Sequence, residues 1–179
     1  MHHFRAITPD DAADLEKLWR ASWTLTYGPS LGPTALSKML NDLDDNGVTS
    51  MLPGTGERGY CMVAADKIKG SAVVAERGSI AYLWGMYVHP RQQRKGLGSQ
   101  LLSGVARTIK DAQEIEIRVL VSSPAALGFY EKNGFLESGK ETVALLDAVT
   151  AEAIVMKIDV ESLRSRPALH SRAGDTPFA

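Results

Sequence analysis

A strand-like apolar stretch that runs into a basic, glycine-containing turn is the feature that most constrains this chain. Residues 86–102 read MYVHPRQQRKGLGSQLL. His89-Pro90 ends the apolar stretch, basic side chains follow, and Gly96 and Gly98 open an amphipathic helix. The first N–H groups of a helix have no intrahelical partner, and the helix dipole favours negative charge beside them. This order of residues therefore predicts a binding site for an anionic diphosphate.

The glycine spacing excludes two common nucleotide-binding turns. The dinucleotide-binding motif needs a third glycine where this chain has Leu101, and the Gly-Lys-Ser/Thr of the Walker loop is absent. The pattern present is Gln-x-x-Gly-x-Gly, over residues 93–98. It resembles the acyl-CoA signature of the GNAT acetyltransferases, in which Arg or Gln opens the motif. Residues 87–90 resemble the end of that family's fourth strand.

A second motif strengthens the resemblance. Residues 123–135 read SPAALGFYEKNGF, similar to the GNAT helix that carries Phe-Tyr-Glu-Lys-x-Gly-Phe. The two motifs occur in the family's order, separated by a predicted helix and strand. The resemblance covers the layout of residues 4–158 and is closest at 82–102 and 123–135.

The resemblance implies the GNAT fold, an α/β (α+β by some schemes) architecture. Its mixed central sheet has about six to seven strands, is splayed between strands 4 and 5, and is accompanied by about four helices. Periodicity predicts strands at residues 4–7, 60–65, 68–76, 80–88, 116–121, 135–146 and 151–158, and helices after 8–11, after 32–34, at 97–110 and at 124–132. The continuous β-branched run at 116–121 is interpreted as a buried strand. Residues 1–160 are expected to form one domain, and 161–179 a C-terminal extension outside the core.

The resemblance implies acetyl-CoA as the cosubstrate. Backbone groups at the end of the fourth strand are expected to pair with pantetheine, and the N–H groups of residues 94–99 to hold the pyrophosphate. Ser123 stands where family members often have an Asn that contacts pantetheine. Arg91 adds charge beside the loop. The expected cofactor-binding residues are Met86, Tyr87, Val88, Gln93, Arg94, Lys95, Gly96, Leu97, Gly98, Ser99 and Ser123.

Tyr130 is the predicted catalytic residue. Acetyl transfer from a thioester to an amine releases a thiolate, which a phenol can protonate as a general acid. The alternative is a core aromatic that packs beside Phe129. Tyr82 stands where family members often have a general-base Glu, so the base is left unassigned. The unranked alternatives are Glu76, Glu141, Asp147, Glu152, a water chain and a backbone carbonyl.

The acceptor is expected to be a small-molecule or peptide primary amine, bound across the sheet from CoA. The available aromatics are Trp23, Tyr27, Tyr82 and Trp84. Cys61 matches neither motif, so no covalent acyl-enzyme is implied. Two other classes stay open: a CoA-binding sensor or catalytically silent domain, and a phosphate or nucleotide binder that uses only the glycine loop.

Composition narrows the remaining classes. The formal net charge of −1 gives no global basic field, so no nucleic-acid partner is expected. The single cysteine excludes an internal disulfide and fits a reducing compartment. No signal peptide or membrane span is recognised, and the terminal histidines form no metal pattern. We therefore expect a cytoplasmic protein, monomeric or homodimeric, with no metal and no membrane partner.

Overall fold

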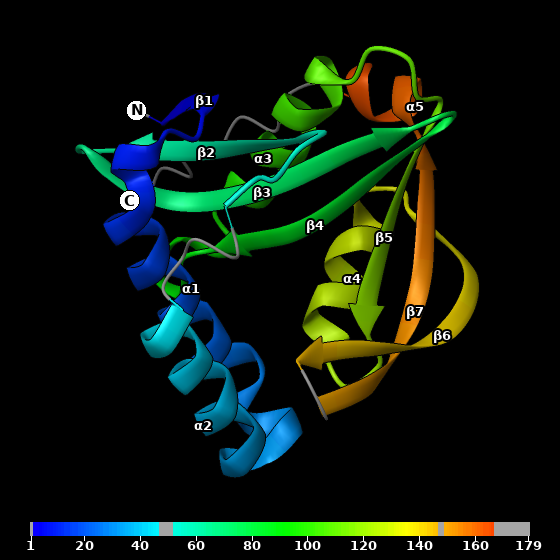
Figure 1. Cartoon of the computed structure of the whole chain (residues 1–179). Helices are drawn as coiled ribbons and strands as arrows, with labels where there is room; N and C mark the ends of the chain where they lie inside the picture. The colour runs from blue at the N-terminus through cyan, green and yellow to red at the C-terminus, as the bar shows by residue number, and fades with distance from the viewer. Residues whose placement is uncertain (1, 47–51, 147–148, 167–179) are drawn as a thin grey trace, which may run out of the picture.

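A single seven-stranded sheet organises the chain (Figure 1). The computed structural model describes residues 2–46, 52–146 and 149–166. The strand order is β1-β2-β3-β4-β5-β7-β6, and only the β4–β5 pair is parallel. The strands are His3–Ala6 (β1), Glu57–Ala64 (β2), Lys67–Arg77 (β3), Ile80–Val88 (β4), Glu114–Leu120 (β5), Leu136–Leu146 (β6) and Val149–Asp159 (β7).

Helices cover both faces of this sheet. They are Ala12–Thr26 (α1), Gly28–Asn46 (α2), Leu97–Thr108 (α3), Pro124–Lys132 (α4) and Val160–Arg164 (α5). α2 is interrupted at Gly32, whose φ of 80° lies in the left-handed region that glycine adopts without strain. α1 and α2 pack on one face, whereas α3, α4 and α5 pack on the other. The described residues thus form five α-helices, where about four were expected. The helix that was not expected is α5.

The two faces carry separate apolar cores. Leu15, Leu18 and Trp19 of α1 pack with buried Cys61, and Trp19 Nε1 donates to Ser71 Oγ across 3.0 Å. The larger core packs α3 against the opposite face, where β5 contributes its odd-numbered residues 115–119. The even-numbered positions of β5 are Glu114, Glu116, Arg118 and Leu120. The expected burial of this strand is confirmed within β5 except at Glu114 and Arg118, which are exposed.

The pairing between β4 and β5 stops after three residues. Ile80–Tyr82 pair with Glu114–Glu116, and the two strands then separate. Figure 1 shows them starting side by side and diverging, with α4 lying in the angle between them. The predicted splay between strands 4 and 5 is confirmed. Beyond Tyr82, the backbone of β4 is left without a strand on this side, so its N–H and C=O groups can pair with a ligand.

A β-bulge lies in the separated part of β4. Val73 pairs with Trp84 and Ser71 with Tyr87, so one residue of β3 faces two residues of β4. Gly85 in the bulge has a φ of 56°. The extra residue changes which way later side chains point, so that Tyr87 packs on the α1 core. The extra residue of a bulge is also left out of the hydrogen bonding between β3 and β4, so its backbone N–H is free to bond another group.

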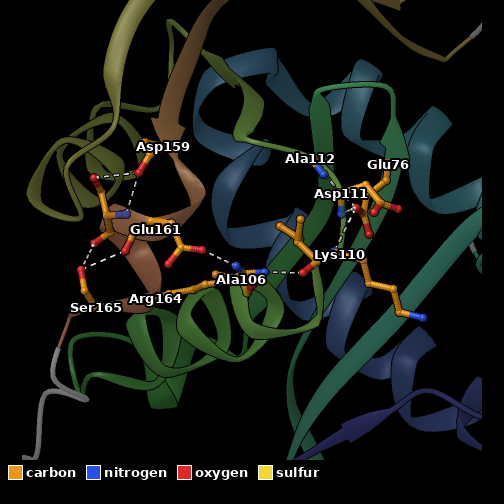
Figure 2. A network of polar contacts seen from close by, with 11 residues as sticks. Glu76, Ala106, Lys110, Asp111, Ala112, Asp159, Glu161, Arg164 and Ser165 are labelled. Carbon is orange, nitrogen blue, oxygen red and sulfur yellow. Dashed lines mark hydrogen bonds and ion pairs between the residues drawn. The ribbon is translucent and has the colours of Figure 1, made fainter.

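The chain continues into the core beyond residue 160. Val160 and Leu163 of α5 are each 2% exposed and pack against α3. Arg164 Nε donates to the Ala106 carbonyl across 3.0 Å, and the same guanidinium reaches the Ile109 carbonyl (Figure 2). The Ala106 carbonyl also accepts the Ile109 N–H, so the guanidinium adds further donors at the end of α3. The expectation that the chain leaves the core at Glu161 is therefore wrong for α5, while residues 167–179 lie outside the described part.

Replacing Leu163 with alanine tests this correction. Removing a fully buried leucine side chain should lower the free energy of unfolding by about 2–5 kcal/mol. Leu136, which is 74% exposed, offers a matched control in which the same change should cost less than about 0.5 kcal/mol. Urea unfolding of both variants measures the difference, and equal effects would show that α5 does not contribute to the core.

Candidate active site

The turn before α3 has the backbone geometry of an anion-binding nest. Arg94 and Gly96 both adopt left-handed conformations, with φ of 59° and 81°. For a non-glycine residue this costs about 1–2 kcal/mol, so the conformation of Arg94 marks a functional constraint. α3 begins at Leu97, and no acceptor within the described residues pairs with its first N–H groups. Exposed N–H groups at a helix start, beside two mobile cations, suit a diphosphate.

The second glycine of the motif serves packing. A Cβ on Gly98 would lie 2.9 Å from two carbons of the Phe129 ring, closer than real Cβ contacts allow. The bare backbone therefore lets α3 approach α4. Phe129 in turn packs edge-on against Tyr130, with ring centroids 5.0 Å apart. Gly98 thus helps to place the predicted catalytic tyrosine rather than giving a ligand access.

Two polar side chains near the turn hold the end of β4. Gln93 Nε2 donates to the Val88 carbonyl across 3.1 Å. The His89 N–H donates to the Lys69 carbonyl across 2.8 Å, and its Nδ1 accepts from the Arg91 N–H across 3.2 Å. Both contacts of His89 are with backbone groups and hold the turn in place. The Gln93 side chain shapes the loop in the same way, so its expected contact with the cofactor stays a prediction.

Ser123 offers an unused hydroxyl at the start of α4. It is 9% exposed, and its Oγ has no hydrogen-bond partner in the described part of the chain. An N-cap serine usually bonds a helix N–H, yet this side chain makes no such bond. A buried polar group without a partner is costly, so the position suits a ligand that supplies one.

Tyr130 lies in a buried aromatic setting on α4. It is 6% exposed and packs edge-on against Phe135, with centroids 5.2 Å apart. Burial raises the pKa of Tyr130, and nearby Tyr87 raises it further. The phenol therefore keeps its proton at neutral pH and can donate it. This position serves core packing and is also compatible with the general-acid role, which stays a prediction.

The four candidate acceptor aromatics separate into two groups. Trp23 packs edge-on against Tyr87 at 6.4 Å, and its Nε1 is buried without a partner among the described residues. Burial raises the pKa of Tyr27, and neighbouring Tyr87 adds to the effect, so both tyrosines stay neutral. Trp23 and Tyr27 therefore meet around Tyr87.

Tyr82 has different surroundings. The guanidinium carbons of Arg77 and Arg118 each lie 5.6 Å from its ring centroid. This ring already interacts with two cations, which makes it a poor receptor for a third. Trp84 lies two residues further along β4, just before the bulge, and is half-buried.

Glu76, one of the candidate bases, is occupied by structural contacts. Its Oε2 accepts the backbone N–H groups of Lys110, Asp111 and Ala112 at 3.0, 2.9 and 3.2 Å (Figure 2). Arg58 forms an ion pair with its other oxygen. Burial alone would raise the pKa of Glu76, but these donors together lower it. Glu76 therefore anchors the segment after α3 and is not placed to accept a substrate proton.

The other carboxylates differ in their surroundings. Glu141 Oε1 pairs with Arg118 Nε at 2.5 Å, and Glu152 accepts from Thr142 Oγ1 at 2.6 Å. Asp147 lies outside the described residues. The sequence interpretation missed Glu116, which is 7% exposed on β5. The signal was present in the alternation of charged and apolar residues over 114–119, which a reading based on β-branched content overlooked.

Hollows elsewhere on the surface do not involve these residues. Two, of about 440 and 460 Å³, lie along β1 and β2 and are lined by none of the predicted site residues. Within the described ranges, no three His, Cys, Asp or Glu side chains group as metal ligands. None of the helices in those ranges has the length and apolarity to span a membrane.

Comparison with known proteins agrees with this geometry. Residues 57–137 match the family model of an acetyltransferase (GNAT) domain. PaiA N-acetyltransferase from Thermoplasma acidophilum, solved with coenzyme A, has a TM-score of 0.68 at 20% identity, covering 89% of this chain and 99% of that one. The ribosomal-protein-S18-alanine N-acetyltransferase from Escherichia coli has a TM-score of 0.65 at 18% identity, covering 100% of both. The GNAT fold expected from the sequence is confirmed.

A curated relative gives a shorter match. An uncharacterized N-acetyltransferase ycf52-like protein of Prochlorococcus marinus is 40% identical over 55 residues, or 31% of this chain. The chain spans 30% of the length of that relative. The resemblance to GNAT acetyltransferases recognised in the two motifs is confirmed by these comparisons together.

The buried tyrosines predict a loss of stability in alkali. Folding raises the pKa of Tyr130. The stability that its neutral, buried phenol contributes is therefore complete below the pKa of tyrosine in the unfolded chain, about 10, and is lost as pH rises above that pKa. The wild type should lose about 1.4 kcal/mol per pH unit more than Tyr130→Phe above about pH 10. Urea unfolding from about pH 9 to 11 tests this. Parallel curves for the two proteins would contradict a neutral, buried phenol.

Proposed function

Since residues 57–137 carry a GNAT acetyltransferase domain, we propose that the protein transfers an acetyl group from acetyl-CoA to a primary amine. One observation supports this above others. The anion-binding turn, the open edge of β4 and the Tyr130 helix all border the place where β4 and β5 separate. A thioester cofactor that follows this edge has its phosphates at the turn and its sulfur near α4.

Each part of the cofactor has a matching group in the chain. The pyrophosphate accepts N–H bonds from residues 94–99, with charge from Arg94 and Lys95. Pantetheine pairs with the backbone of residues 86–88 as an added strand would. The unpaired Ser123 hydroxyl supplies a further hydrogen bond, in place of an amide side chain.

The bulge in β4 suits the acetyl carbonyl. Its extra residue leaves an N–H that the sheet does not use, between Gly85 and Met86. An N–H fixed in this way can donate to the oxyanion that develops when an amine attacks the thioester carbon. Such preorganised donors are typically worth about 2.7–4 kcal/mol in the transition state.

The reaction proceeds by direct attack. The amine nitrogen forms a bond to the carbonyl carbon, the C–S bond breaks, and the sulfur leaves as a thiolate that takes the Tyr130 proton. Cys61 is an unsuitable nucleophile, because it is fully buried and burial raises the pKa of its thiol to about 11. No acyl-enzyme is therefore part of the proposal.

One competing function has an observation in its favour. Tyr82, on β4, interacts with Arg77 and Arg118 and provides no carboxylate. A CoA-binding sensor or silent domain would not need a catalytic carboxylate at this position. Acetyl-CoA turnover with a panel of amines separates this function from the enzyme. A peptide N-terminus belongs in the panel because the E. coli neighbour is named for a ribosomal-protein alanine. A nucleotide binder would instead be stabilised by ATP rather than CoA in a thermal shift.

Gly96→Glu should abolish CoA binding while the fold is retained. The change places bulk and negative charge at a position with φ of 81°, beside the expected pyrophosphate. Gly96→Asn is the matched control, since Asn tolerates the left-handed region and is uncharged. Calorimetric titration with CoA should detect binding to the Asn variant only. Normal binding by the Glu variant would move the cofactor elsewhere.

Tyr130→Phe should lower kcat by about 10²–10⁴-fold and leave CoA affinity almost unchanged. The substitution removes only the hydroxyl and keeps the ring contacts with Phe129 and Phe135. Tyr60→Phe serves as the control, because Tyr60 stacks on Phe4 at 5.2 Å in β2, away from the splay. Unchanged kcat in the Tyr130 variant, with chemistry rate-limiting, would rule out the general-acid role.

A further inference from the structure

Two acidic side chains are buried in the described residues, and their surroundings differ. Asp11 accepts two bonds from Arg5, at 2.7 and 2.8 Å, and two more from the N–H and Oγ of Thr8. These bonds use the acceptor capacity of that carboxylate and hold β1 to the start of α1. Asp11 is therefore structural.

Glu116 is only partly satisfied. Its Oε1 lies 2.6 Å from Arg118 Nη1 and its Oε2 lies 3.3 Å from Lys157 Nζ. Neither partner is a backbone group, and each oxygen retains capacity for another hydrogen bond. Glu116 is 7% exposed and is held by these two cations, with acceptor capacity left for a water or a ligand.

The position of Glu116 relates it to the proposed reaction. It pairs with Tyr82 at the last hydrogen-bonded position of β4 and β5, at the vertex of the splay. Its neighbours Ile115 and Ile117 face the α3 core, so Glu116 lies on the opposite face of the sheet. That is the face on which an acceptor can approach a thioester held from the α3–α4 side.

We propose that Glu116 accepts the proton that the acceptor amine must lose before attack, an assignment that rests on the proposed acetyltransferase function. The bulge lies about two to four residues along β4 from Tyr82, roughly 7–13 Å at the rise of a strand. Glu116 therefore acts through one or two bridging waters rather than by direct contact.

Several charged groups surround Glu116. Arg118 and Lys157 flank the carboxylate, and Arg77 lies across the Tyr82 ring. Nearby cations disfavour an ammonium, which promotes release of its proton, and they also stabilise a carboxylate, which opposes uptake of that proton. Among the described residues, two more charged groups contact this cluster: Glu141, paired with Arg118, and Glu114, 3.8 Å from Lys157.

The protons balance in this sequence of steps. The ammonium passes one proton through water to Glu116, and the neutral nitrogen forms the C–N bond while the C–S electron pair moves to sulfur. Tyr130 gives its proton to the thiolate and recovers one from the positively charged –NH₂⁺– nitrogen formed by the attack, which leaves the neutral amide. Glu116 then returns its proton to solvent, so that the net reaction releases one proton.

Comparison of Glu116→Gln with Glu141→Gln tests the assignment. Both substitutions are isosteric, and both remove a carboxylate partner of Arg118. For an alkylamine acceptor near neutral pH, Glu116→Gln should lower kcat by about 10²–10⁴-fold and leave CoA affinity unchanged. Glu141→Gln should stay within about threefold of wild type, since the median exposed ion pair is worth about 0–1 kcal/mol.

Two further readouts separate proton transfer from structural damage. Activity of Glu116→Gln should rise tenfold per pH unit through the neutral range, because only free amine then reacts. With a fluorinated alkylamine that is already uncharged at neutral pH, Glu116→Gln should lower kcat by less than about tenfold. Should Glu116→Gln fail to fold, Glu116→Asp keeps the charge but withdraws the carboxylate by one methylene, and should show a smaller loss that is again confined to the alkylamine.

The outcomes distinguish the two levels of the proposal. Equal losses for both amines, or an unchanged pH profile, would overturn the role of Glu116 and leave the enzyme function standing. A wild-type protein that binds CoA but consumes no acetyl-CoA with any amine would overturn both.

Discussion

The early end of hydrogen bonding between β4 and β5 is the constraint on which the rest of the structure depends. Three paired residues hold the strands together, and beyond Tyr82 and Glu116 each strand follows a different half of the molecule. β4 continues antiparallel to β3 under α1, whereas β5 continues beside β7. A sheet with uninterrupted pairing would bury the backbone groups that a pantetheine arm needs.

The order of elements was predictable because local patterns determine it. Alternating and helical periodicities, with glycine and proline at the breaks, placed most strands and helices near their observed bounds. The splay followed from the resemblance carried by the two motifs. α5 was missed because a five-residue helix followed by prolines and arginines resembles a solvated tail. Its burial depends on Leu163 and Arg164 meeting α3, a contact that sequence periodicity does not report.

The candidate site was predictable as a set of positions, but the chemistry of individual residues was not. The turn expected to bind an anion has left-handed backbone at Arg94 and Gly96, which glycine spacing indicates. Ser123 has the unpaired hydroxyl that a cofactor contact requires. Glu76 appeared equivalent to other carboxylates until its three N–H donors were located. Such partners come from segments distant in sequence, so they depend on tertiary structure.

The contact between Gly98 and Phe129 has a consequence for how this sequence can change over time. Any Cβ at position 98 would collide with the ring at 129, which belongs to a different helix. A substitution at position 98 therefore requires the ring to shift or to become smaller. Two sites from separate motifs should for this reason vary together among descendants of this chain.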